Sequence, residues 1–218
     1  IIEVVSGFKL DDFLHDNIFK PLNMIDTDFY VPEDKHDRFV DCYQELVSKS
    51  GNKLKRCHKG GEDIFSKKRN FLSGGGGLCS TLADYANFCQ MILNEGYFDG
   101  KQLLSPITVR FMRENHLPNN QTMNEMGDDN FSEVRYDGAG FGLGFSSLID
   151  PVKSMSPLSL GSISWGGMAS TFFWIDPQEN LFAILLTQLI PSGRYPIRPQ
   201  AQTLVYSALS ELNKNTRL

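Results

Sequence analysis

Trp165-Gly166-Gly167-Met168 ends one extended segment, residues 160–164, and a second extended segment, residues 170–177, follows it closely. Small residues at the end of an apolar strand let another group approach the backbone closely. Backbone N–H groups at such a place could stabilise an oxyanion, the negatively charged oxygen of an acyl-transfer intermediate. The pattern therefore predicts half of an acyl-transfer site. A strand bulge with a core tryptophan is the alternative that the pattern leaves open.

The residues around this motif predict an antiparallel sheet. Strands are expected at 141–149, 160–165, 171–175 and 181–187, with turns such as Asp176-Pro177 between them. The last of these segments is apolar without alternation, which is typical of a strand in the middle of a sheet, buried on both faces. A final helix is expected after Pro199, with one apolar side formed by Leu204, Val205, Ala208 and Leu212. The free edge of the 181–187 strand would then be either paired with a further segment or exposed.

The earlier part of the chain predicts helices joined by long loops. Amphipathic helices are expected over 9–19 and after Thr81, where Thr81 and Asp84 match a capping box. Ser105-Pro106 predicts the start of a third helix. The four glycines at 74–77 adjoin the second helix and predict a tight turn. Residues 26–70 and 115–138 are polar and are expected to be loops with little regular structure.

Helices followed by an antiparallel meander and a covering helix predict an α+β fold with α/β/α layers. We expect residues 1–138 to form part of a helical subdomain with long loops. Residues 139–218 are expected to form the antiparallel strands and C-terminal helix of an α/β subdomain, and the two would interleave as one domain in the complete protein. Residues 1–7 have the pattern of the end of a helix closed by a glycine. The chain is therefore expected to be a fragment, a processed subunit or a structure without its N-terminal part.

Composition excludes several classes of function. The 218 residues carry a net charge of −5 with no long charged block, which disfavours nucleic-acid binding. No apolar run reaches the roughly 20 residues of a membrane span. The cysteines form no Cys-x-x-Cys pair, so no zinc site, other metal or cofactor is predicted, and a reducing compartment is favoured. The compartment stays unknown, because a signal upstream of residue 1 would not be seen. The four cysteines are Cys42, Cys57, Cys79 and Cys89.

Taken together, several segments of the chain resemble the serine β-lactamase-like hydrolases, above all the family VIII esterases and class C-like β-lactamase homologues. The segments are residues 1–7, 18–29 (where Asn23 replaces the usual glycine), 74–85, 141–145 and 174–177. Their order and spacing carry the resemblance, which runs over most of the chain. It implies a β-lactamase/transpeptidase-like fold that lacks its N-terminal strands and catalytic helix here.

In that family, Trp-Gly-Gly takes the place of the Lys-Thr-Gly strand of β-lactamases. The resemblance implies that Trp165, Gly166 and Gly167 bind substrate at the edge of the acyl site. It also implies that the backbone N–H of Met168 is one oxyanion donor, the second being the N–H of the nucleophilic serine. Tryptophan replaces the lysine that holds a substrate carboxylate in β-lactamases, which favours esters over β-lactams.

The nucleophile of the family is the serine of a Ser-x-x-Lys motif, activated by that lysine and by a tyrosine from a second motif. Ser50-Gly51-Asn52-Lys53 matches the first motif in letters, but Gly and Asn disfavour a helix there. Tyr85-Ala86-Asn87 matches the second, but it lies on an amphipathic helix and is expected to pack in the core. We therefore expect both true motifs to precede residue 1 and the chain alone to be inactive.

Two other functions stay open: a non-catalytic binding or scaffold relative, and a D-amino-acid peptidase similar to penicillin-binding proteins. The sequence upstream of residue 1 would separate them from the esterase. The expected partners are a small-molecule ester or β-lactam-like substrate, and the missing N-terminal segment or a second chain. No Gly-x-Ser-x-Gly elbow occurs, and Gly140-Phe141-Gly142-Leu143-Gly144 is not followed by a helix. Neither an α/β-hydrolase nor dinucleotide binding is predicted.

Overall fold

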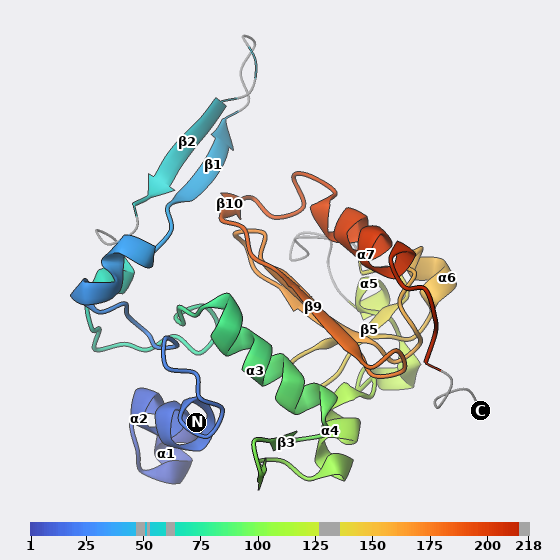
Figure 1. The fold of residues 1–218 in the computed structure, drawn as a ribbon, viewed down its shortest axis with the longest axis horizontal. Coiled ribbons are helices and arrows are strands. Elements are labelled where there is room, and N and C mark those ends of the chain that lie inside the picture. The colour runs from blue at the N-terminus through green and yellow to red at the C-terminus, as the bar shows by residue number, and fades with distance from the viewer. Residues whose placement is uncertain (47–50, 52, 60–63, 127–135, 214–218) are drawn as a thin grey trace. The chain divides into compact units, whose positions relative to one another are not determined.

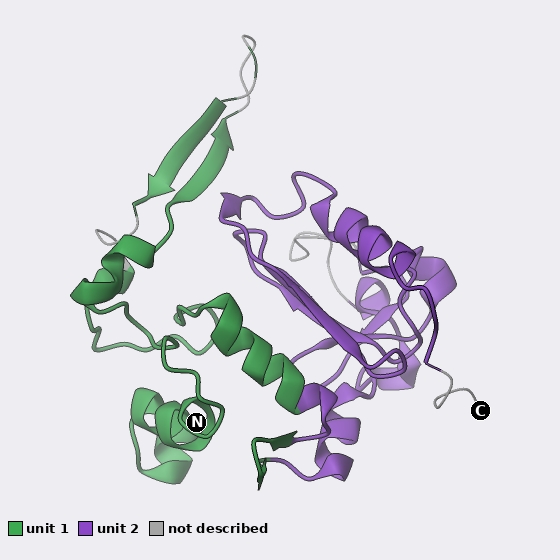
Figure 2. Ribbon diagram, in the orientation of Figure 1, with its two compact units in different colours: residues 1–91, 97–103 green, residues 92–96, 104–218 purple. Residues whose placement is uncertain are grey.

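A computed structural model describes residues 1–46, 51, 53–59, 64–126 and 136–213. The described chain forms two compact units, which Figure 2 colours separately. The first contains residues 1–91 and 97–103, and the second contains residues 92–96 and 104–218. The predicted subdomain boundary after residue 138 concerns the complete protein and stays a prediction.

The first unit begins with short helices. Helix α1 covers Ile2–Ser6 and ends at Gly7, whose φ of 75° is the left-handed conformation that glycine adopts without strain. Helix α2, Leu10–Leu14, continues into a π-helical turn, His15–Phe19. The helix end predicted over residues 1–7 and the helix predicted over 9–19 are both confirmed (Figure 1).

The rest of the first unit contains a hairpin and a longer helix. A 3-10 helix, Glu33–Arg38, precedes the antiparallel hairpin of β1, Cys42–Leu46, and β2, Lys53–His58. A second 3-10 turn, Ile64–Ser66, and the tight turn at 74–77 lead to α3, Leu82–Leu93. The tight turn is closed by a hydrogen bond from Gly77 N to Ser73 O at 2.9 Å, as predicted. A two-residue hairpin of β3, Tyr97–Phe98, and β4, Lys101–Gln102, follows.

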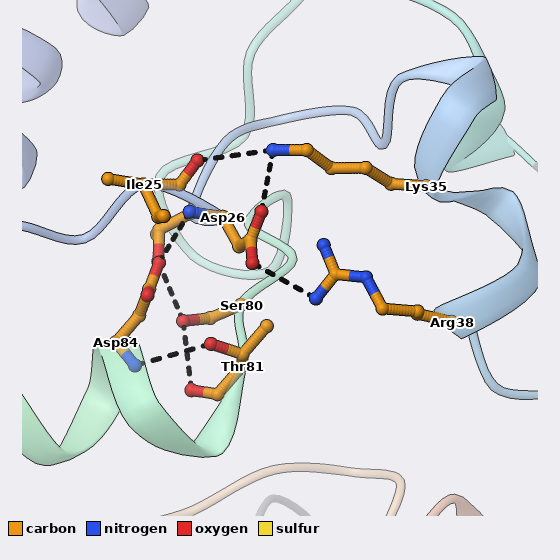
Figure 3. Close-up of polar contacts among 8 residues, drawn as sticks. Ile25, Asp26, Lys35, Arg38, Ser80, Thr81 and Asp84 are labelled. Carbon is orange, nitrogen blue, oxygen red and sulfur yellow. Dashed lines mark hydrogen bonds and ion pairs between the residues drawn. The ribbon is translucent and has the colours of Figure 1, made fainter.

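The loop after Pro21 is joined to the start of α3 by the buried carboxylate of Asp84 (Figure 3). Asp84 Oδ2 accepts hydrogen bonds from Asp26 N at 2.7 Å and from Thr27 Oγ1 at 2.8 Å. Thr81 Oγ1 accepts one from Asp84 N at 3.2 Å, which is the N-cap bond of the predicted capping box. Both of these contacts of the Asp84 carboxylate lie in the loop after Pro21, so the carboxylate joins segments that are 57 residues apart.

The Asp26 carboxylate, on the other side of this network, makes stability depend on pH. Lys35 Nζ lies 2.6 Å and Arg38 Nη1 lies 3.0 Å from its two oxygens, and the hydrogen bonds from Arg38 and then Lys35 lower the pKa of Asp26 to about 2. A carboxyl group whose pKa is lower in the folded state stabilises that state above its ordinary pKa of 3.8, and the contribution disappears as the pH falls through 2.

We therefore expect Asp26→Asn to lower the free energy of unfolding at pH 6 and to have almost no effect near pH 2. Urea unfolding of both proteins between pH 6 and pH 2 measures this difference. Glu33→Gln, which changes an exposed acid on the neighbouring 3-10 helix, is the matched control. A difference in free energy of unfolding between wild type and Asp26→Asn that stays constant from pH 6 to pH 2 would contradict the role given to the Asp26 carboxylate.

The second unit is built on a five-stranded antiparallel sheet in which the strands follow one another in chain order (Figure 1). The strands are β5 Ala139–Phe141, β6 Ser146–Leu148, β7 Ile163–Gly166, β8 Phe172–Asp176 and β9 Leu181–Leu185. The helical segments of the unit are α4 Pro106–Arg113, the 3-10 turn Pro118–Asn120, α5 Met123–Met126, α6 Pro151–Ser154 and α7 Ile197–Ser207. A short strand, β10 Leu189–Ile190, precedes α7.

Helix α7 covers one face of this sheet. The core under it contains Leu148, Leu158, Phe172 and Trp174, and Ala201, Val205 and Tyr206 of α7 pack against that core. Ser105 caps α4 as predicted, since its side chain accepts a hydrogen bond from Thr108 N at 3.2 Å. The mixed α+β architecture with an antiparallel sheet and a covering C-terminal helix is the one expected from the sequence.

The strand predicted over 141–149 is wrong as a single element, because a turn divides it into β5 and β6. Gly142 N donates to Phe145 O at 2.8 Å, and Gly144 has a φ of 98°. A Cβ on Gly142 would lie 2.2 Å from Met112 O, so only glycine allows α4 to approach here. The glycines of this segment therefore serve a tight turn and close packing.

Strand β9 pairs only with β8 among the described residues of this unit, and its residues are half-buried, which agrees with the expectation that its other edge is left for a further segment. The expectation for the C-terminal helix needs correction. Helix α7 begins at Ile197 and includes Pro199 in its first turn. Proline is tolerated there because the N–H groups of the first turn have no partner within the helix. Its sheet side is formed by Ala201, Val205 and Tyr206, whereas three of the four residues predicted for that side are exposed, namely Leu204, Ala208 and Leu212.

Candidate functional site

The Trp165-Gly166-Gly167-Met168 motif occupies the end of β7 and the tight turn into β8. Trp165 pairs with Phe173 and Gly166 pairs with Phe172. The turn is closed by two hydrogen bonds, from Ser170 N to Gly167 O and from Gly167 N to Thr171 O, each 3.0 Å long. Ser170 completes the turn with a φ of 68°, as in a hairpin that ends in a β-bulge.

The tip of this turn is attached to the residues that follow β9. Ser170 Oγ donates to Leu189 O at 2.7 Å, and Leu189 N donates to Ala169 O at 3.0 Å. Thr187 Oγ1 donates to Ser170 O at 3.1 Å. A left-handed serine is strained, and these bonds compensate for that strain. The backbone of the motif is therefore held on both sides of its tip.

The Met168 N–H points to a possible binding role. Within the part of the chain that the structure describes, this N–H has no hydrogen-bond acceptor, and the Met168 side chain is 60% exposed. Its neighbours on both sides, Gly167 and Ala169, are held by the bonds described above. A fixed backbone donor without an acceptor, next to two glycines, can bind an anionic oxygen.

The Trp165 ring is oriented by two aromatic neighbours. Tyr136 stacks on it with a centroid distance of 5.5 Å and an interplanar angle of 13°, and Phe141 meets it edge to face at 5.2 Å. Trp165 is half-buried, whereas Trp174 is 1% exposed and is the tryptophan of the core. Trp165 is therefore not the fully buried tryptophan of the core, and its role in binding stays a prediction. Tyr136 could not be found from the sequence, because it stands in a polar stretch without periodicity.

Neither of the two motif-like decoys has the local setting of a catalytic motif. Ser50 lies outside the described residues, and Lys53 begins the exposed strand β2 and is not part of a helix. Tyr85 lies on α3, where burial raises the pKa of its phenol, which makes it a poor proton acceptor near neutral pH. Asn87 Nδ2 donates to Leu22 O at 2.9 Å, so its amide is used in packing.

Other kinds of site find no support in the described ranges. No group of three or more His, Cys, Asp or Glu side chains there is arranged to hold a metal ion. All four cysteines are free thiols, and burial raises the pKa of Cys89 to about 12, which makes it unreactive. None of the described helices has the length and apolar character needed to cross a membrane.

Comparison with known proteins agrees with the resemblance seen in the sequence. The family model described as Beta-lactamase matches residues 1–206. Protein Rv1367c of Mycobacterium tuberculosis (strain ATCC 25618 / H37Rv) is 32% identical over 194 residues, which are 88% of this chain and 46% of that protein. Lovastatin esterase of Penicillium rubens is 26% identical over 206 residues, 87% of this chain and 48% of the esterase.

The fold has solved relatives. Unliganded simvastatin synthase (LovD) from Aspergillus terreus superposes with a TM-score of 0.75 at 21% identity, over 96% of this chain and 53% of that one. The chain spans about half the length of the curated relatives that it matches. Because the family model matches residues 1–206, which are nearly the whole chain, this chain belongs to the beta-lactamase family.

Proposed function

We propose that this chain is the C-terminal part of a β-lactamase-like serine hydrolase that forms an acyl-enzyme with esters and, less efficiently, with β-lactams. The observation that carries the proposal is the Met168 N–H, a fixed backbone donor without an acceptor among the described residues. Trp165, Gly166 and Gly167 would line the substrate beside it.

The reaction that suits this hairpin is acyl transfer through a serine supplied from outside the described residues. The serine oxygen attacks the ester carbonyl carbon, and the carbonyl oxygen becomes an oxyanion that accepts hydrogen bonds from Met168 N–H and from the serine's own N–H. The carbon–oxygen bond to the alcohol then breaks, and the alcohol leaves with the proton removed from the serine. Water attacks the acyl-enzyme in the same way and releases the acid.

Esters are favoured because the motif carries no cation for a substrate carboxylate. Trp165, which stands where β-lactamases of this fold have lysine, offers an aromatic surface oriented by Tyr136 and Phe141. The curated relative named lovastatin esterase supports the same choice.

The chain alone should be inactive, and a further segment should complete it. Strand β9 has pairing on one edge only among the described residues of its unit, and Leu186 and Leu204 are exposed. These features suit a strand and a helix contributed by an N-terminal segment of the whole protein or by a second chain. That segment would bring the Ser-x-x-Lys motif and the tyrosine.

We expect 4-nitrophenyl esters to be hydrolysed by the product of the longest reading frame that contains this sequence and not by residues 1–218 alone. Nitrocefin should be a much poorer substrate. Ser50→Ala in the longer product is the control and should leave the rate unchanged. Turnover by residues 1–218 that disappears on Ser50→Ala would contradict the proposal. A longer product without Ser-x-x-Lys and without hydrolysis would favour a non-catalytic binding relative.

A further inference from the structure

Arg198 lies directly under the candidate oxyanion turn. It belongs to the first turn of α7, and only 8% of it is exposed. Its Nη2 donates to Gly167 O at 3.1 Å and to Thr171 O at 3.2 Å. Its Cζ lies 5.3 Å from the centroid of the Phe172 ring, a distance at which a cation is attracted to the ring.

The bond to Gly167 O bears on Met168 because both atoms belong to one peptide group. A peptide group is planar and trans, so its C=O and its N–H point in opposite directions. Fixing the Gly167 carbonyl toward Arg198 therefore directs the Met168 N–H away from Arg198. A cationic donor on the carbonyl oxygen also polarises the group and strengthens its N–H as a donor.

The charge of Arg198 has an unusual environment. Among the described residues no carboxylate is bonded to it, and its Nε is buried without an acceptor. A buried cation without an anionic partner is costly in free energy. An oxyanion that forms on the other side of the Gly167–Met168 peptide would supply the missing negative charge during the reaction.

We propose that Arg198 is a positioning residue that orients and polarises the Gly167–Met168 peptide, and so sets the strength of the Met168 N–H as an oxyanion donor. This inference rests on the proposed function of Met168. It predicts that loss of Arg198 acts on the transition state more than on substrate binding.

The test compares Arg198→Ala, Arg198→Lys and Arg194→Ala in the longer product. Arg194 is an exposed arginine of the loop before α7 and serves as the control. We expect Arg198→Ala to lower kcat for a 4-nitrophenyl ester about 10- to 100-fold, less than the roughly 100- to 1,000-fold found when an oxyanion donor itself is lost, while KM changes less than threefold. Arg198→Lys keeps the positive charge but not the planar guanidinium group, so its kcat should lie between those of Arg198→Ala and wild type. The kcat of Arg194→Ala should match that of wild type.

A spectroscopic measurement separates positioning from simple structural support. The amide nitrogen of Met168 is bonded to the carbonyl that Arg198 holds, so its ¹⁵N resonance should move in Arg198→Ala and Arg198→Lys and stay in place in Arg194→Ala. A kcat of Arg198→Ala within twofold of wild type would overturn the inference. So would a loss of activity that is fully explained by the fraction of Arg198→Ala protein that is unfolded.

The two proposals fail in distinguishable ways. If the wild-type longer product hydrolyses no ester, the proposed function fails, and the Met168 ¹⁵N resonance alone decides on Arg198. An unmoved resonance in folded Arg198→Lys then overturns the positioning role, and a moved one supports it.

Discussion

Asp176→Ala is expected to lower the free energy of unfolding by about 3 to 5 kcal/mol, because it removes a buried acceptor that several segments share. The Asp176 carboxylate is fully buried at the end of β8 and accepts four hydrogen bonds. The donors are Ser159 N at 3.1 Å, Gln178 N at 3.0 Å, Glu179 N at 3.2 Å and Tyr206 Oη at 2.6 Å. A donor left without an acceptor in the interior costs about 1 to 3 kcal/mol, and these donors are partly buried, so water compensates for part of the loss.

Two conservative variants sharpen this prediction. Asp176→Asn keeps one acceptor oxygen and should cost less than Asp176→Ala. Tyr206→Phe removes a single donor and should cost about 1 kcal/mol or slightly more. Urea unfolding measures all three, with Asp16→Ala as a matched change of an exposed aspartate. A loss below 1 kcal/mol in Asp176→Ala would show that the carboxylate does not join these segments.

Asp176 illustrates what the sequence predicts and what it does not. Asp176-Pro177 correctly marks the turn after β8, because Asp and Pro favour turns locally. The bonds to Ser159 and Tyr206 join residues 17 and 30 positions away, and no local pattern indicates them. Apolar segments and turn residues were sufficient to predict the meander, since each strand pairs with the next one along the chain.

What the sequence left open or predicted wrongly depended on what surrounds an element. The apolar run of β9 indicates burial on both faces but does not say which segment covers or pairs it. Similarly, the apolar residues of α7 lie on more than one side of the helix, and Ala201, Val205 and Tyr206 pack against the core of the sheet whereas Leu204 is exposed. Periodicity could not decide which side faces the sheet.

For the candidate site, the sequence predicted the motif but not its supports. The glycines, Trp165 and Met168 were identified through their pattern and the family resemblance. Arg198 was not, because an arginine at the start of a helix is normally exposed. Its contacts with a turn 27 to 31 residues earlier become visible only in three dimensions.

Gly166→Ala is expected to destabilise the hairpin far more than Gly167→Ala, although the two glycines are adjacent. A Cβ on Gly166 would lie 2.8 Å from Thr171 O and 2.6 Å from Arg198 Nη2. The first atom belongs to the paired backbone and the second to a buried, bonded guanidinium, so neither can move away freely. Overpacking of this kind costs about 1 to 3 kcal/mol. A Cβ on Gly167 would meet only Thr171 Oγ1, at 2.7 Å, and a rotation of that side chain relieves it.

The same geometry predicts coupling between Gly166 and Arg198. In an Arg198→Ala background, the contact of the new Cβ with the guanidinium is gone and the contact with Thr171 O remains. Gly166→Ala should then cost less than in wild type, and a double-mutant cycle by urea unfolding should give a coupling of at least about 0.5 kcal/mol. In the longer product, Gly166→Ala should also abolish ester hydrolysis, because it displaces the peptide that carries the Met168 N–H, whereas Gly167→Ala should retain part of the activity. Additive costs in the cycle would mean that the hairpin relaxes around the new methyl group without moving Arg198, and the close packing between α7 and the turn would then have no consequence for the site.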